Sequence, residues 1–206
     1  MNEGGIRLTA DRAFLRIFVF FLFLAAFPSS GFAAESLTFY DWEVRFQPNG
    51  NRPVSCSIHL TGVNRKQRVL LDVNLSVIIE KAPLIGRKAT TILRVKANRI
   101  NRPDLSDLSP IQIQNAWMAT SLGSSLGQMA KIDVRPDVHY LGGKEGSGLF
   151  HLLLEGIVKD GAAIGYQEEA GGAEIVSSVP LPPPDVIINK LMPCLAAVLP
   201  DQDQPA

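Results

Sequence analysis

A serine between two glycines, Ser125, is the residue in this sequence that most resembles a catalytic nucleophile. Residues 123–127 (GSSLG) fit the G-x-S-x-G pattern, in which a strand leads through a sharp turn into a helix and the serine hydroxyl projects as a nucleophile. Asp137, His139 and His151 follow in an order that a catalytic triad could use. These residues suggest a small secreted serine hydrolase using Ser125 with Asp137 and His139 or His151.

The sequence around Ser125 argues against this hydrolase. Little room is left between Gly127 and the extended-looking stretch 133–136 for the helix that the motif requires. A short pattern of serine and glycine also fits an ordinary loop. The hydrolase is therefore the alternative hypothesis, and catalytic residues are not expected.

The sequence contains no residue pattern typical of a metal site or a cofactor site. Asp137 and His139 would share one face if they lay on a strand, but a metal site needs three or four ligands. No cysteine or second histidine lies near them in sequence. Lys144 lacks the surrounding pattern of a phosphate-binding loop. We expect no metal and no cofactor.

Alternation of apolar and polar residues, which is typical of strands, dominates the first half of the chain. The longest alternation covers 69–79, with further strands expected over 54–60 and 91–97. A strand over 37–46 needs a bulge near Tyr40, so that Leu37, Phe39, Trp42, Val44 and Phe46 can all point inward. The connections are too short for crossover helices, which favours an antiparallel meander. The fold class expected is mostly β, an antiparallel β-sandwich.

The second half of the chain is less regular. We expect a flexible loop over 141–148 and a buried segment at 150–154 that could be helix or strand. A hairpin is predicted from 163–167 and 175–181. Asp185 is expected to cap a short C-terminal helix that Pro193 breaks or restarts.

The first 33 residues have the three parts of a secretory signal peptide. Three arginines precede an eleven-residue apolar run at 17–27, and small residues prepare a cleavage site between Ala33 and Ala34. The run is shorter than the about 20 residues that span a bilayer, so no transmembrane span is expected after cleavage. We therefore expect a periplasmic or secreted protein with one domain over 34–199 and a disordered tail at 200–206.

Two cysteines, Cys56 and Cys194, both lie in the part of the chain expected to be exported. Disulfides form in such oxidising compartments. A Cys56–Cys194 bridge would tie the start of the domain to its end, and the alternative is two buried free thiols.

Charge is distributed unevenly along the chain. Residues 45–102 hold twelve lysines and arginines but two acidic residues, whereas residues 103–206 hold five basic and thirteen acidic residues. Either the basic segment forms a surface for anionic partners or the two halves pair their charges. Envelope polysaccharide, lipid headgroups or a protein are the expected partners, and an exported location disfavours nucleic acid. The candidate binding patch comprises Arg65, Lys66, Arg68, Arg87, Lys88, Arg94, Lys96, Arg99 and Arg102.

Four segments occur in an order found in one bacterial family. They are 40–45 (YDWEVR), 56–58 (CSI), the long strand 69–79 and 92–95 (ILRV). Together they resemble the opening of the invasion-associated locus B family of envelope proteins over residues 38–97. The resemblance implies an export signal, a compact β-sandwich and a role in host-cell association rather than catalysis.

The chain departs from that family in its cysteines. Phe46 stands where the family usually has a cysteine shortly after the Asp-Trp motif, and the family's middle cysteine pair is missing. The family's disulfide pattern and its role in invasion therefore do not carry over. The leading hypothesis is a non-enzymatic envelope protein that binds through its surface. A structural or chaperone-like module is a third hypothesis, for which the sequence has no specific sign.

Overall fold

The computed structural model describes residues 35–48, 54–82, 86–132, 138–169 and 172–198. Every described residue belongs to one compact unit, Ala34–Ala206. The predicted signal peptide, its cleavage site at Ala33 and Ala34, and the tail at 200–206 lie outside the described residues. Among the described residues, no helix is long and apolar enough to cross a membrane.

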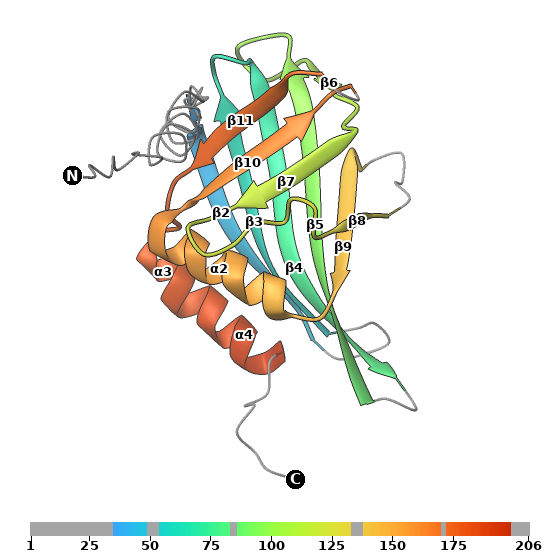
Figure 1. Cartoon of the computed structure of the whole chain (residues 1–206). Helices are drawn as coiled ribbons and strands as arrows, with labels where there is room; N and C mark the ends of the chain where they lie inside the picture. Colours follow the sequence, from blue (N-terminus) through green and yellow to red (C-terminus); the bar gives the residue numbers. More distant parts are fainter. Residues whose placement is uncertain (1–34, 49–53, 83–85, 133–137, 170–171, 199–206) are drawn as a thin grey trace, which may run out of the picture. The chain divides into compact units, whose positions relative to one another are not determined.

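The larger layer is an antiparallel sheet that contains seven of the strands within the described residues (Figure 1). Its order is β2-β3-β4-β5-β9-β8, with β6 also paired to β5. The long strands β2 to β5 form the predicted meander, which is confirmed. The bounds are β2 Thr38–Gln47, β3 Val54–Asn64, β4 Val69–Ala82, β5 Gly86–Ile100, β6 Leu108–Pro110, β8 Ala130–Lys131 and β9 Tyr140–Glu145.

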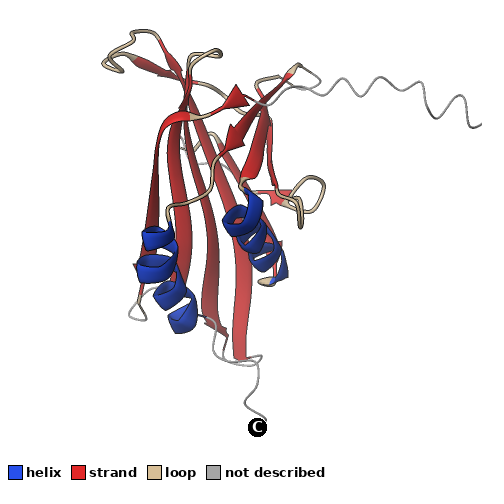
Figure 2. Ribbon diagram, turned by 90° about the vertical axis from the view of Figure 1, so that its left-hand side faces the viewer, coloured by secondary structure: helices blue, strands red, loops and turns tan. Residues whose placement is uncertain are grey.

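A smaller sheet and the helices form the second layer, on one face of the large sheet (Figures 1 and 2). The smaller sheet has the order β1-β11-β10-β7, from Glu35–Ser36, Glu174–Val179, Ala162–Gln167 and Asn115–Ala119. Helix α2 (Gly148–Asp160) packs against β4 and β5, and α4 (Met192–Val198) packs against β2 and β3. Short α3 (Pro184–Val186) and the π-helical segment η1 (Ile187–Leu191) lead into α4. The predicted β-sandwich with a C-terminal helix is confirmed, as is the hairpin of β10 and β11.

The core lies between these layers. Alternate residues of β4 from Val69 to Val77 are at most 2% exposed, and Phe150, Leu153 and Ile157 of α2 are fully buried. Cys56 and Cys194 form a disulfide whose Cα atoms are 5.7 Å apart. The bridge joins β3 to α4, which confirms the predicted pairing.

The first strand contains the expected bulge. Pairing between β2 and β3 shifts register between Thr38 and Asp41, and Leu37 and Trp42 are both buried as predicted. The prediction is wrong for Phe46, which is 45% exposed. Strand β2 is at the edge of the sheet, and Phe46 lies next to its last residue, where fewer neighbours cover it.

Residues 141–148 do not form the expected flexible loop. Most of this segment is β9, paired with β5 and β8. A Cβ atom on Gly142 would lie 2.8 Å from the Tyr140 hydroxyl, and one on Gly143 would lie 2.7 Å from Ile132 Cδ1. The glycines therefore make room for neighbouring side chains in a strand.

The helices differ from the sequence expectation in one respect and resolve it in another. The buried segment left open between helix and strand lies in α2. The predicted cap is wrong, because the last helical region begins at Pro184 after Pro183 and has no side-chain cap hydrogen bond from Asp185. A proline at the first helical position is favoured because its missing N–H would have no intrahelical partner there.

Candidate binding face

The polar side of the large sheet, facing away from the smaller sheet and the helices, carries the candidate site. We call this side the outer face. In β3 and β4 the side chains alternate, so that Cys56, Ile58 and Leu60 enter the core while Ser57 and His59 project from the outer face. Because successive side chains point to opposite sides of a strand, the same strands supply both the core and the polar outer face.

Strand register assembles the outer-face residues into rows. Glu43 on β2 is opposite His59 on β3, which is opposite Asn74 on β4, which is opposite Arg94 on β5. In the adjacent row on the side of the β3–β4 turn, Asp72 lies between Thr61 and Lys96. Residues far apart in sequence therefore meet at the centre of the face.

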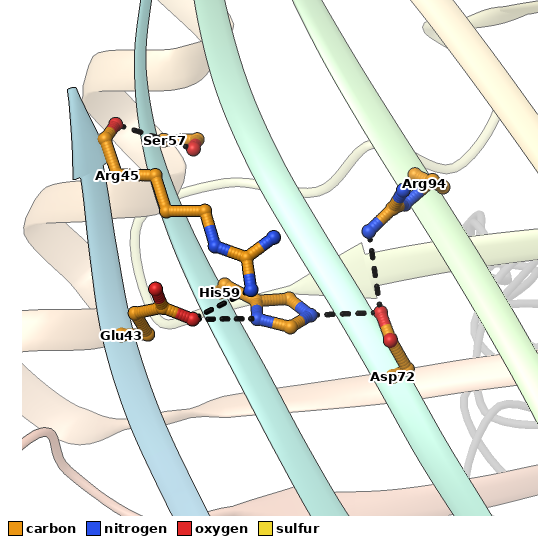
Figure 3. Close-up of polar contacts among 6 residues, drawn as sticks. All are labelled: Glu43, Arg45, Ser57, His59, Asp72 and Arg94. Carbon is orange, nitrogen blue, oxygen red and sulfur yellow. Dashed lines mark hydrogen bonds and ion pairs between the residues drawn. The ribbon is translucent and has the colours of Figure 1, made fainter. Parts of the chain in front are cut away.

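A network of charged contacts crosses this centre, and we call its five members the charged ladder: Glu43, Arg45, His59, Asp72 and Arg94 (Figure 3). His59 Nε2 lies 2.8 Å from Asp72 Oδ1, and His59 Nδ1 lies 3.6 Å from Glu43 Oε2. Glu43 also pairs with Arg45 at 2.6 Å, and Asp72 pairs with Arg94 at 3.4 Å. Each carboxylate thus faces an arginine and the same imidazole.

The ladder keeps its carboxylates ionised. Burial raises the pKa of Asp72, but the hydrogen bond and charge of His59, with the charges of Arg94 and Lys96, outweigh burial, so this pKa lies below its usual value. The hydrogen bond from Arg45 likewise lowers the pKa of Glu43. Both acids are therefore negative near neutral pH.

A groove of about 740 Å³ lies along the ladder on the outer face. Its polar lining combines two guanidinium groups with hydroxyl and amide groups, and Ile92 and Leu141 add an apolar strip. Arg94 Nε is buried and has no hydrogen-bond partner among the described residues. The lining residues are Arg45, Phe46, Gln47, Pro48, Ser55, Ser57, Asn74, Ile92, Arg94 and Leu141.

These groups suit binding better than catalysis. His59 is 8% exposed and its ring nitrogens face carboxylates, while the Ser57 hydroxyl donates to the Arg45 carbonyl at 3.4 Å. A nucleophile requires a base directed at its hydroxyl, and His59 is directed elsewhere. The groove instead combines fixed hydrogen-bonding groups with positive charge, as ligand sites do.

Ser125 lies in a turn after β7 and has a structural contact. Its hydroxyl accepts a hydrogen bond from the Met118 N–H at 2.9 Å, and its own N–H donates to the Met118 carbonyl at 2.8 Å. The side chain is 4% exposed, and residues 126–128 form a turn rather than the helix of a nucleophile elbow. These contacts hold the loop against β7.

The proposed partners of Ser125 are not assembled around it in the described part of the chain. His139 is buried and its Nδ1 accepts the Ala97 N–H at 2.9 Å, while His151 is exposed on α2. Burial lowers the pKa of His139, which favours the neutral ring. Asp137 lies outside the described residues. The described residues contain no group of three histidines, cysteines or carboxylates placed to hold a metal.

The basic residues named from the sequence do not form one patch. Arg65, Lys66 and Arg68 lie in the turn between β3 and β4, and Arg102 follows β5 at the same end of the sheet. Lys88 lies at the opposite end of β5, and the side chain of Arg87 lies outside the described residues. Arg94 belongs to the ladder, with Lys96 in the next row.

The predicted charge pairing between the two halves occurs at the ends of the sheet. Lys88 pairs with Glu145 at 2.5 Å, and Arg99 pairs with Glu168 at 3.1 Å. Sequence reasoning missed the ladder acids and the groove, because pairing Glu43, His59 and Asp72 requires the register of three strands. The polar residues Ser55, Ser57 and His59, which alternate with apolar residues in β3, could have indicated a polar face on this sheet.

Compared with known proteins, the chain matches no family model, no curated protein and no solved structure. The resemblance to the invasion-associated locus B family thus stays a prediction.

Proposed function

We propose that this chain is an exported, non-enzymatic binding protein of the cell envelope, periplasmic or secreted, that acts through the outer face of its large sheet. The observation that carries the proposal is the groove, where Arg45 and Arg94 accompany hydroxyl and amide groups. The Cys56–Cys194 disulfide supports an oxidising compartment.

An anionic polysaccharide is the partner that these groups suit best. Guanidinium groups bind carboxylates and phosphates through paired N–H donors. Ser55, Ser57 and Asn74 can exchange hydrogen bonds with sugar hydroxyls, and Ile92 and Leu141 offer an apolar surface to a sugar ring. A serine hydrolase has less support, because Ser125 is buried and bonded to Met118.

Binding to polygalacturonate, with neutral dextran for comparison, tests the proposal. We expect saturable binding to polygalacturonate that weakens as salt screens the charges, and weaker binding to dextran. Replacing either groove arginine, in Arg45→Gln or Arg94→Gln, should weaken polygalacturonate binding about tenfold by removing a charge-assisted contact.

Lys159→Gln is the matched control, because it removes one exposed positive charge from α2 in the other layer. Its polygalacturonate affinity should equal that of the unmodified protein. Equal affinity for both polymers, or equal losses in all three variants, would reject the groove as the binding site.

The compartment is tested separately by the intact mass of the protein from an extracytoplasmic fraction. We expect a mass that begins at or near Ala34 and thiols that become alkylated only after reduction. A full-length mass with freely alkylated thiols would reject export.

A further inference from the structure

A second concavity lies at the end of the sheet where the β3–β4 turn meets the loop after β5. It has a volume of about 560 Å³ and is lined by Val63, Arg65, Arg68, Ile100, Pro103 and Leu105. We call it the arginine-rimmed pocket. The groove described above has no lining residue in common with it.

Its lining combines two different chemistries. Val63 and Ile100 are at most 7% exposed, and Pro103 and Leu105 complete an apolar lining. Arg65 and Arg68 supply positive charge from the turn on the other side. Leu105 itself is 42% exposed, and nearby Leu108 is 38% exposed. An apolar cavity beside two cations suits a ligand with an anionic head and a hydrocarbon tail.

Two hydrogen bonds, one from a side chain and one between backbone groups, join the two walls of the pocket. The Arg68 guanidinium donates to the Asn101 carbonyl at 3.1 Å, and the Ile100 N–H donates to the Arg68 carbonyl at 2.8 Å. Arg68 and Leu105 both have left-handed backbones, with φ of 53° and 61°. Such conformations are uncommon for residues other than glycine and are costly, and here both occur in residues that line one cavity.

The acidic residues of the same loop are directed to donors within that loop. Asp104 accepts hydrogen bonds from the N–H and hydroxyl of Ser106, and Asp107 accepts one from the Asn101 side chain. The turn at 65–68 holds three basic residues and no acidic one. This turn therefore contributes positive charge to the pocket rim.

We propose that the arginine-rimmed pocket binds a single-chain anionic amphiphile, with its carboxylate or phosphate head at Arg65 and Arg68 and its alkyl chain against Val63, Ile100, Pro103 and Leu105. The volume falls within the roughly 300–1,000 Å³ of small-molecule sites. This inference goes beyond the polysaccharide proposal and depends on different residues.

Calorimetric titration of the purified protein with octanoate, decanoate and octanol, all below micelle formation, tests it. Each buried methylene should tighten binding about fourfold, so decanoate should bind about fifteenfold more tightly than octanoate. Octanol, which has the tail without the charge, should bind at least tenfold more weakly than octanoate.

Two variants preserve the left-handed backbone, because asparagine tolerates it. Arg68→Asn should weaken decanoate binding about tenfold and octanol binding less, because octanol has no charge to lose a partner. Leu105→Asn should reduce the dependence on chain length. Lys159→Gln should bind decanoate normally. Circular dichroism and thermal unfolding verify that each variant is folded.

Three results would overturn the proposal. They are equal affinity for octanoate and octanol, unchanged decanoate affinity in folded Arg68→Asn, and binding to phosphatidylglycerol vesicles without saturable decanoate binding. The last result would indicate a membrane-binding surface in place of a pocket. Polygalacturonate titrations of Arg68→Asn and decanoate titrations of Arg94→Gln separate failure of this inference from failure of the proposed function.

Discussion

Removing the Cys56–Cys194 disulfide should lower the free energy of unfolding by several kcal/mol. The bridge spans 138 residues, and closing a loop of that length in the unfolded chain corresponds to about 5 kcal/mol in the chain-entropy treatment. Native disulfides in small exported domains contribute about 2–5 kcal/mol. Since domains are stable by only about 5–15 kcal/mol, reduction should remove a large share of the total.

Urea unfolding with and without reductant measures this loss. The reduced protein should have a lower midpoint and a steeper denaturant dependence, because its unfolded chain is less compact and exposes more surface. A Cys56→Ala/Cys194→Ala double variant should resemble the reduced protein and should not respond to reductant. It controls for effects of reductant on other groups.

The structure also predicts where the reduced protein loosens first. The bridge attaches α4 to β3, and besides Cys194 the segment 184–198 buries Val186, Leu191 and Val198. Hydrogen exchange should therefore accelerate in residues 184–198 before it accelerates in β4. A loss of less than 1 kcal/mol, or equal acceleration in α4 and β4, would refute this account of the bridge.

Three substitutions, one of them with a matched control, test other features. Asp72→Asn should lower stability by about 1 kcal/mol at pH 7, because a charge-assisted contact is lost. Since folding depresses the pKa of Asp72, its stabilisation is present above the unfolded value near 3.9 and disappears as pH falls through the lower folded value; the two proteins should therefore converge in acid unfolding curves. Gly165→Ala should cost about 1–3 kcal/mol in urea unfolding, because a Cβ would overlap the Trp117 ring, whereas Gly148→Ala meets no neighbour and should not destabilise. Tyr166→Phe should leave thermal stability unchanged or raised, because the buried hydroxyl has no hydrogen-bond partner among the described residues.

Each substitution has an outcome that contradicts its reasoning. A stability gap between Asp72→Asn and the unmodified protein that persists once Asp72 is protonated would show that packing, not charge, causes the loss. Equal stability of the Gly165→Ala and Gly148→Ala proteins would mean that the smaller sheet adjusts freely. A loss above 1 kcal/mol in Tyr166→Phe would reveal a partner for the hydroxyl.

Local patterns in the sequence were sufficient to predict the long strands. The alternation over 69–79 predicts which side of β4 is buried, and the out-of-phase apolar residues around Tyr40 predict the bulge in β2. Both follow from side chains alternating between the two faces of a strand. The pairing of Cys56 with Cys194 was predictable because these are the two cysteines in the chain.

The prediction of a flexible loop at 141–148 is wrong because it relied on the glycines of β9. Gly142 and Gly143 are typical of a loop by composition, yet here they avoid clashes with Tyr140 and Ile132. Those contacts come from packing that no local pattern reveals. The same limit applies to the candidate site, since the ladder exists only because β2, β3, β4 and β5 pair in one register.

The ion pairs show which basic residues of segment 45–102 are neutralised by acids of the second half of the chain and which are not. Lys88 and Arg99 are paired with acids of the second half, so the charge imbalance of the sequence exaggerates the positive surface. Arg45 and Arg94 also have carboxylate partners, but those partners lie within the ladder and both guanidinium groups still line the groove. A guanidinium has five N–H donors, and one carboxylate contact occupies few of them. Charges of the two halves therefore neutralise each other at the ends of the sheet, while Arg45 and Arg94 line a groove in the middle of the outer face. Ligand binding should be sought in that groove.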